Sequence, residues 1–179
     1  MANMDHLEAF ILGLRKIYPE YFVPSFCPSD GGVNAEIMFL LEKPGPMTDP
    51  ENGGSGYVSF DNNDPTACAS REFIRQIGLE RKKIIVWNAI PIWNGTRHIS
   101  STERKNAWAH LKELLDVLPN LRSIVLVGNQ AQKMQKNLDS THYKIFNSAH
   151  PSPIVRSRFP EKWAKIPEQW REAFQRSIV

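Results

Sequence analysis

Four segments that each follow a short apolar run are the first places to look for side chains that do chemistry, and three of the four are polar and turn-forming in an unusual way. They are Glu42-Lys43-Pro44-Gly45, Asn88-Ala89-Ile90-Pro91, Gly128-Asn129 and Ser148-Ala149-His150-Pro151-Ser152-Pro153. A carboxylate, an amide and an imidazole at one place can position a water, hold the edge of a heterocyclic ring and stabilise negative charge. The sequence therefore predicts a hydrogen-bonding and acid–base site, provided that the fold brings these groups together.

The tetrapeptide His150-Pro151-Ser152-Pro153 is the most distinctive of these groups. Two prolines separated by one residue keep the backbone stiff and extended, which fixes the position of the histidine. Ser152 adds a hydroxyl and a backbone amide that can bind a phosphate. The alternative is a rigid surface turn with an exposed histidine, and the position directly after an apolar run argues against it.

Asn88 and Glu42 also stand directly after apolar runs. The amide of Asn88 offers a donor and an acceptor, which suits the edge of a pyrimidine ring, although an asparagine at a strand end is also a common turn former. The carboxylate of Glu42 could position or deprotonate a water, and Lys43 could lower the pKa of that carboxylate or hold an anion. An exposed ion pair between Glu42 and Lys43 is the competing interpretation.

Phe60 is an aromatic residue in a long loop that is rich in glycine. An aromatic ring in such a loop can stack on an extruded base, which contributes roughly 1–3 kcal/mol per base. The alternative is a residue that fixes the long loop to the core. The sequence leaves both roles open.

The elements that must position these residues follow from the apolar pattern. Residues 37–41, 84–87, 124–127 and 143–146 are predicted to be buried strands, and amphipathic segments alternate with them. This order predicts a three-layer α/β/α fold with a central, mostly parallel, four-stranded sheet. Such sheets bind ligands beyond the carboxyl ends of their strands, where the four segments fall.

Helix ends can be predicted at several places. Ser100 and Glu103 form a capping-box pattern, and Thr66 is the predicted N-cap of an earlier helix. A short helix is expected over residues 130–138. Residues such as Trp170 and Ile178 predict a C-terminal helix in which Pro167 is a break or a first-turn residue.

Length and composition favour one globular domain over residues 1–179, and we expect a monomer. No apolar stretch approaches the roughly 20 residues that span a bilayer, and the N-terminus lacks the pattern of a signal peptide, so a cytoplasmic protein is expected. The two cysteines, Cys27 and Cys68, are read as reduced thiols. They cannot supply the four thiolates of an ordinary iron–sulfur cluster, and neither a metal nor another cofactor is expected.

The net charge of +3 is distributed unevenly along the chain. Residues 1–70 carry 3 Lys/Arg against 10 Asp/Glu, whereas residues 120–179 carry 10 against 4. A basic C-terminal third could meet the phosphates of a nucleic acid, through Arg156, Arg158 and Lys162, or could be a solvated surface whose charges pair in space.

Together, Leu41-Glu42-Lys43-Pro44-Gly45, Asn88-Ala89-Ile90-Pro91 and His150-Pro151-Ser152-Pro153-Ile154 resemble, in order, the motifs of the uracil-DNA glycosylase superfamily. The resemblance covers roughly residues 36–154. It implies that Pro44 and Gly45 form the turn after the first core strand, that Asn88 reads the edge of uracil and that Phe60 stacks on the base. It also implies that His150 stabilises charge on the departing base, and that Ile154 fills the space left in the DNA by the flipped nucleotide.

The first motif departs from the pattern of many relatives, which carry Asp or Asn where this chain has Lys43. A glutamate at the position of Glu42 is found in the branch with an iron–sulfur cluster, so the chain resembles a cluster-free outlying branch. We expect Glu42 to hold the attacking water, with Asp61, Asn62 and Asp64 as alternatives. Lys43 is expected to point away from the sugar, toward a phosphate or Asp64.

Three functions remain open from the sequence. The first is a monofunctional glycosylase that binds DNA, cleaves the bond between base and sugar by hydrolysis, and has no abasic-site lyase activity. The second is a module of the same fold that binds uracil-containing or modified DNA without cutting it, which the presence of Lys43 allows. The third is a small-molecule hydrolase that uses the pocket at the strand ends.

Overall fold

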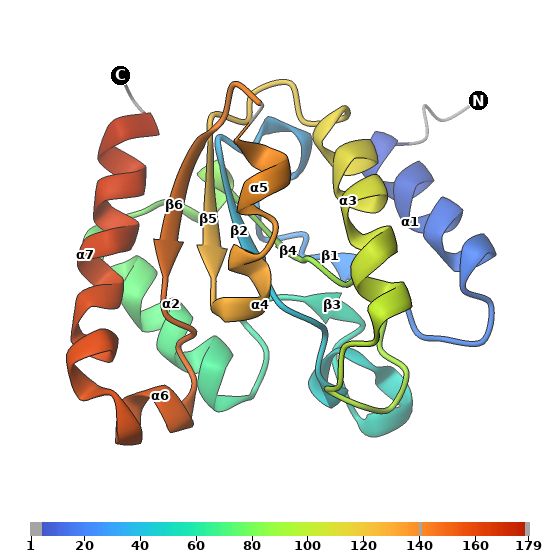
Figure 1. The fold of residues 1–179 in the computed structure, drawn as a ribbon, viewed down its shortest axis with the longest axis horizontal. Coiled ribbons are helices and arrows are strands. Elements are labelled where there is room, and N and C mark those ends of the chain that lie inside the picture. The colour runs from blue at the N-terminus through green and yellow to red at the C-terminus, as the bar shows by residue number, and fades with distance from the viewer. Residues whose placement is uncertain (1–4, 140, 178–179) are drawn as a thin grey trace.

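A computed structural model describes residues 5–139 and 141–177 of the chain, which fold around one sheet (Figure 1). Its four strands lie in the order β4-β2-β5-β6 and all pair in parallel. They comprise β2 (Ile37–Leu41), β4 (Ile84–Asn88), β5 (Ser123–Val127) and β6 (Lys144–Ser148). The predicted parallel sheet is therefore confirmed, although β6 begins and ends slightly later than the apolar pattern of residues 143–146 indicated.

Helices cover both faces of this sheet and give the predicted three layers (Figure 1). On one face, α2 (Pro65–Ile77) packs against α7 (Pro160–Ser177), and α7 lies on β5 and β6. The other face carries α1 (His6–Ile17), α3 (Ser101–Leu115), α4 (Asn129–Gln132) and α5 (Gln135–Leu138). The short helix α6 (Pro153–Arg158) precedes α7.

The three strands β2, β4 and β5 are buried along their whole length, as expected for parallel strands covered on both faces. The edge strand β6 is only partly buried. The largest buried side chains include Trp87, Trp170 and Phe39. The indole Nε1 of Trp170 donates a hydrogen bond of 2.9 Å to Ser148 Oγ, which ties α7 to the carboxyl end of β6.

Three local predictions about helices were wrong. Asp64, not Thr66, caps α2, because Pro65 takes the first helical position and the Asp64 carboxylate accepts from Ala67 N–H at 3.0 Å. Pro167 neither breaks the C-terminal helix nor begins it, since α7 continues through it and buries Ile166 and Trp170 on either side. The helix expected over residues 130–138 is divided into α4 and α5.

Not every local prediction about the helices was wrong. The capping box of Ser100 and Glu103 is confirmed. Ile178 lies outside the described residues. No helix in the described part of the chain is long and apolar enough to cross a membrane.

The segments before β2, between β2 and α2, and before β4 contain short elements that the sequence pattern did not predict. A second small parallel sheet joins β1 (Ser25–Phe26) to β3 (Tyr57–Val58). Single 3-10 turns occur over Gly32–Asn34, Pro46–Thr48, Pro50–Asn52 and Arg81–Lys83. The β1–β3 pairing holds the loop that carries Phe60 near the carboxyl edge of the main sheet.

Candidate active site

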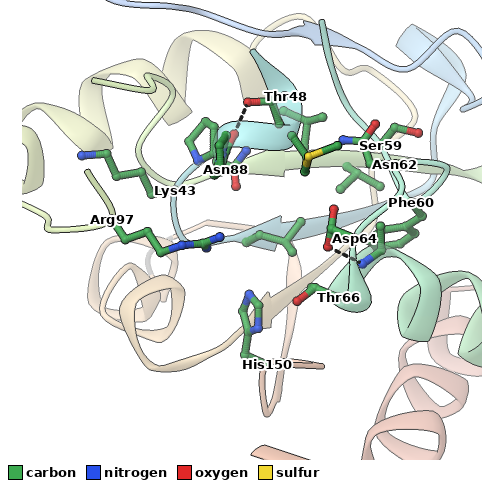
Figure 2. Close-up of a pocket in the computed structure, with 18 residues that line it drawn as sticks. Lys43, Thr48, Ser59, Phe60, Asn62, Asp64, Thr66, Asn88, Arg97 and His150 are labelled. Carbon is green, nitrogen blue, oxygen red and sulfur yellow. Dashed lines mark hydrogen bonds between the residues drawn. The ribbon is translucent and has the colours of Figure 1, made fainter. Parts of the chain in front are cut away.

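The carboxyl edge of the sheet holds a pocket of about 110 Å³, several times the roughly 10–15 Å³ that one water needs. Its walls come from the turn after β2, from the end of β4, from the Phe60 loop and from the segment after β6 (Figure 2). The polar and aromatic side chains that line it are Lys43, Thr48, Ser59, Phe60, Asn62, Asp64, Thr66, Asn88, Arg97 and His150. Several chain segments thus meet where the sequence predicted a site.

Strand register brings the sequence motifs side by side. Leu41 and Asn88 pair across β2 and β4, and the ladder continues past the strand ends, since Ala89 N–H donates to the carbonyl of Leu41 at 2.8 Å. On the other side of the sheet, Gly128 N–H donates to the carbonyl of Ser148 at 3.0 Å. Parallel pairing therefore places the Glu42, Asn88 and His150 segments at one edge.

Asn88 is buried at the end of β4 and its side chain faces the pocket. Among the described residues, its side-chain amide has no hydrogen-bond partner. Both its donor and its acceptor are therefore available to a ligand in the pocket. Figure 2 shows Asn88 and His150 approaching the pocket from opposite sides. A ring between them could receive hydrogen bonds at both edges.

Phe60 packs on the core and also lines the pocket, so its position is compatible with both roles that the sequence left open. Its side chain is 2% exposed; its ring lies nearly parallel to that of Trp170, at 11° with centroids 6.0 Å apart, and meets Phe39 edge-on at 5.7 Å. Arg71 Nη1 also donates to the Phe60 carbonyl at 2.8 Å. The ring is therefore fixed to the core and also lines the pocket, so it can offer a preformed stacking surface.

The carboxylate of Asp61, next to Phe60, is turned away from the pocket. Arg81 pairs with Asp61 at 2.9 Å and with the buried Asp30 at 2.6 Å. Burial raises the pKa of Asp30 to about 6, although the charge of Arg81 opposes the shift. Arg81 thus ties the Phe60 loop to the segment after β1. The Asp61 carboxylate is used in this ion pair with Arg81 and does not line the pocket.

Asn62 and Asp64, the other two alternatives, do line the pocket. The side chain of Asn62 is already bonded to Ser55 Oγ at 2.6 Å and to the Tyr57 carbonyl at 3.0 Å, which stabilises the loop. Asp64 uses one oxygen to cap α2. Of the three alternatives named from the sequence, Asp64 is therefore the one with a carboxylate at the pocket.

His150 lies half-buried at the boundary of the pocket. Burial is the largest influence and lowers the pKa of its imidazole below the ordinary 6.5; the negative charge of Glu42 opposes this, and the positive charge of Arg97 reinforces it. The imidazole is therefore neutral at pH 7. A neutral imidazole still has one N–H that can donate to an oxygen that gains negative charge.

Glu42 lies next to His150 but outside the pocket itself. Its Oε1 accepts a hydrogen bond of 3.1 Å from the backbone N–H of Gln130. Gly128, with φ of 89°, makes the approach possible, because a Cβ at this position would lie 2.5 Å from Glu42 Oε1 and 3.1 Å from His150 Cβ. The absence of a side chain at Gly128 thus lets the carboxylate and the histidine share one corner of the site.

Lys43 points away from the strand ends, as expected, but toward a different partner from those predicted. Its ammonium donates to Glu103 Oε1 at 2.7 Å, Asn94 Oδ1 at 2.8 Å and the His98 carbonyl at 2.8 Å, and its side chain is 3% exposed. Burial raises the pKa of Glu103, yet the hydrogen bonds from Lys43 and Ser100 outweigh it and leave the pKa below its ordinary value. The expected contact with phosphate or Asp64 is therefore wrong: all three donors of Lys43 are used within the chain.

A groove of about 630 Å³ adjoins the pocket and shares Lys43, Arg97 and His150 with it. Its other polar side chains include Glu42, Arg104 and Lys162. Ile154, which is 64% exposed, and Phe159 stand on its α6 side. Ser152 lines it as well and caps α6 through Val155 N–H at 3.3 Å. The groove is wide, basic and partly apolar.

Arg156 and Arg158 are exposed on α6, but neither lines the groove. The guanidinium of Arg156 lies 5.6 Å from the ring centroid of Trp163. Arg97 and Thr48, by contrast, line the pocket and were not singled out from the sequence. Both come from irregular segments without periodicity, so no pattern indicated them.

A parallel α/β sheet with a pocket and a basic groove at its carboxyl edge is a common enzyme arrangement, and comparison with known proteins makes the assignment specific. The family model of the uracil DNA glycosylase superfamily matches residues 28–175. The chain belongs to the uracil DNA glycosylase superfamily, as the motifs indicated. A search of curated proteins gave no match.

Two solved structures illustrate the likeness of the fold. One is a solution NMR structure of a candidate uracil DNA glycosylase from Methanosarcina acetivorans, 17% identical, with a TM-score of 0.52; the match covers 82% of this chain and 92% of that one. The other is a crystal structure of a variant of mimivirus UNG in complex with UGI, 14% identical, with a TM-score of 0.48 and coverage of 85% and 66%. At these identities the first comparison supports the fold alone, and the second carries no further argument.

Proposed function

We propose that this protein is a DNA glycosylase that flips uracil or a related altered base out of DNA and hydrolyses its N-glycosidic bond, as in base excision repair. The observation that carries the proposal is the amide of Asn88, which has no partner among the described residues and lines a small pocket that faces His150 and adjoins a basic groove. A base inside a duplex is inaccessible, so chemistry on it requires extrusion into a pocket of this kind. Family membership supports the same reaction class.

In this account the base lies in the pocket and its sugar and phosphates lie in the groove. Asn88 hydrogen-bonds the edge of the base, Phe60 stacks on it, and the turn at Pro44 and Gly45 forms part of the wall. When the bond between C1′ and the base nitrogen breaks, its electron pair leaves with the base. The N–H of His150 donates to the base oxygen on which the negative charge develops.

Glu42 acts on the sugar side. It lies beside His150 in the groove, where its carboxylate can hold a water near C1′ and stabilise the positive sugar. The water oxygen forms the new bond to C1′. The proton lost by the water passes through Glu42 or solvent to the base anion, which is then released as a neutral base. The reaction needs no metal and no lyase step.

The segment after β6 contacts the DNA. Ile154 is a large apolar side chain that is mostly exposed at the edge of the groove, which suits insertion into the space vacated by the flipped nucleotide. Ser152 offers its hydroxyl to a neighbouring phosphate, and Pro153 fixes the start of α6. Insertion would bury apolar surface of Ile154 that is now in water.

A binding module that does not cut is the second candidate. The sequence allowed it because a lysine beside the sugar would oppose formation of a sugar cation. The ammonium of Lys43 is instead paired with Glu103 and faces away, which favours the enzyme.

The test incubates the purified protein with uracil-containing and plain oligonucleotides, then measures alkali-labile sites and a salt-dependent gel shift. Alkali-labile sites that form only in uracil-containing DNA support the glycosylase. A shift without cutting supports the binding module. If neither cutting nor a shift is observed, the small-molecule hydrolase becomes the favoured function. A wider panel of altered bases then identifies the preferred substrate.

Replacing Asn88 with Asp is expected to slow uracil release by about 10- to 100-fold, because an ionised carboxylate cannot donate to a base carbonyl and each good pair of hydrogen bonds contributes about 1–3 kcal/mol. Single-turnover rates on uracil-containing DNA measure the effect. Asn63→Asp, an exposed neighbour of the pocket residue Asn62, adds the same charge as a control. Equal rates for Asn88→Asp and the parent would remove Asn88 from base recognition.

Replacing both Arg156 and Arg158 with Ala is expected to flatten the dependence of DNA affinity on salt. Each lost phosphate contact lowers the slope of log affinity against log salt by about 0.9, for every DNA sequence alike. Titrations at several salt concentrations measure the slope. The matched control is Arg75→Ala with Arg176→Ala, which removes two exposed arginines from the last turns of α2 and α7. A slope equal to the parent's would place the phosphate contacts elsewhere.

A further inference from the structure

Arg97 stands at the boundary between the pocket and the groove and lines both. Among the described residues, its guanidinium has no hydrogen bond and no ion pair. The other two basic residues on this side of the groove already have partners within the chain. Lys43 forms an ion pair with Glu103, and Arg104 donates to Gln130 Oε1 at 2.8 Å. Arg97 is therefore a cation at the site that has no partner within residues 5–139 and 141–177.

Hydrogen bonds on both sides of Arg97 hold the loop that carries it, although Arg97 itself is exposed. Lys43 binds the side chain of Asn94 and the carbonyl of His98, so the loop is tied down on both sides of Arg97. The guanidinium lies over Gly45, where a Cβ would come within 3.3 Å of Arg97 Nη2 and 3.6 Å of Nη1. A loop that is already ordered loses less freedom when the side chain that it carries binds an anion.

A nucleotide whose base occupies the pocket must cross this boundary with its sugar and phosphates. Of the three residues common to the two cavities, Lys43 has no donor left and His150 is neutral. We infer that Arg97 binds a phosphate that flanks the extruded nucleotide, with a bidentate, charge-assisted pair of hydrogen bonds. This inference rests on the proposed function and adds a phosphate subsite to it, with Lys43 as the positioning residue that anchors the loop.

The placement also explains the Lys43 substitution in the first motif. A lysine at the strand end does not face the sugar, because its ammonium organises the loop that presents Arg97. The cation that acts on the DNA is then Arg97, on the phosphate side. A positive charge there binds DNA without opposing the sugar cation as directly as one beneath the ring.

The test uses duplexes with a single 2′-fluoro-2′-deoxyuridine, whose glycosidic bond resists cleavage, and with a neutral methylphosphonate in place of the phosphate 5′ or 3′ to it. For the parent protein, one of the two methylphosphonates should weaken binding by about 10- to 100-fold, the effect of one charged hydrogen-bonded contact. Arg97→Ala should weaken binding to the all-phosphate duplex by a similar factor, and that methylphosphonate should weaken it no further. Arg97→Lys should recover part of the loss, and Arg75→Ala should behave as the parent.

Two results would overturn the inference. Arg97→Ala could bind the all-phosphate duplex as tightly as the parent does, or it could keep the parent's sensitivity to the methylphosphonates. In the second case the arginine acts on the base or on the fold. A parent protein that neither binds nor cuts any uracil-containing duplex contradicts the proposed function instead, so the two failures are distinct.

Discussion

Replacing His150 with Ala is expected to slow release of the base by about 100- to 1,000-fold, the usual cost of removing one well-placed donor to a developing anion. DNA affinity should change little, because the imidazole acts mainly when charge develops on the departing base. Single-turnover rates and gel-shift affinities separate the two effects. His142→Ala, which removes an exposed histidine before β6, is the control and should leave both unchanged.

The state of His150 gives this prediction a pH dependence. Burial lowers the pKa of the imidazole below 6.5, so the neutral form already dominates at pH 6.5 and above. The single-turnover rate of the parent should therefore not fall between pH 6.5 and about 8. If the imidazolium were required, the rate would drop about tenfold per pH unit above the pKa. Near-normal rates in His150→Ala would remove the leaving-group argument.

Replacing Glu42 with Gln is expected to slow base release by a comparable 100- to 1,000-fold, on the order of one catalytic charge. Glutamine keeps the size of the side chain and an oxygen that can accept from Gln130 N–H, so folding and DNA affinity should be preserved. What is lost is the negative charge that holds the water and stabilises the sugar cation. Glu51→Gln, at an exposed position in the long loop, is the control.

Near-normal single-turnover rates in Glu42→Gln would assign the water to another residue. Asp64 is then the candidate, since its carboxylate lines the pocket, and Asp64→Asn should show the loss instead. Asp61 is a poor alternative, because Arg81 holds it at 2.9 Å in an ion pair outside the pocket.

The sheet and the main site motifs could be predicted because they depend on short-range patterns. Continuous apolar runs mark the buried parallel strands, and a parallel sheet necessarily places the residues after those strands at one edge. Glu42, Asn88 and His150 therefore meet as expected. Phe60 was expected either to fix the loop to the core or to stack on a base, and its packing against Trp170 could not be predicted because Trp170 lies far away in the sequence.

What could not be predicted depends on pairs that are distant in the sequence. Lys43 and Glu103 are separated by 60 residues, and the pattern that identified Glu103 explained it fully as a capping-box residue. Nothing in the sequence shows that the same carboxylate also neutralises Lys43. Arg97 could not be singled out from the sequence, because only the fold shows that it lies at the junction of two cavities and has no partner among the described residues.

The most direct test of the central claim measures free uracil released from a uracil-containing duplex supplied in excess, by the parent protein and by Asn88→Asp and His150→Ala prepared identically. We expect more than one uracil to be released per parent molecule, with abasic DNA formed in equal amount and with no strand break until alkali is added. The two variants should release far less, which excludes a contaminating host enzyme. Equal release by all three preparations, or none from the parent with any altered base, would contradict the assignment of this pocket as a glycosylase active site.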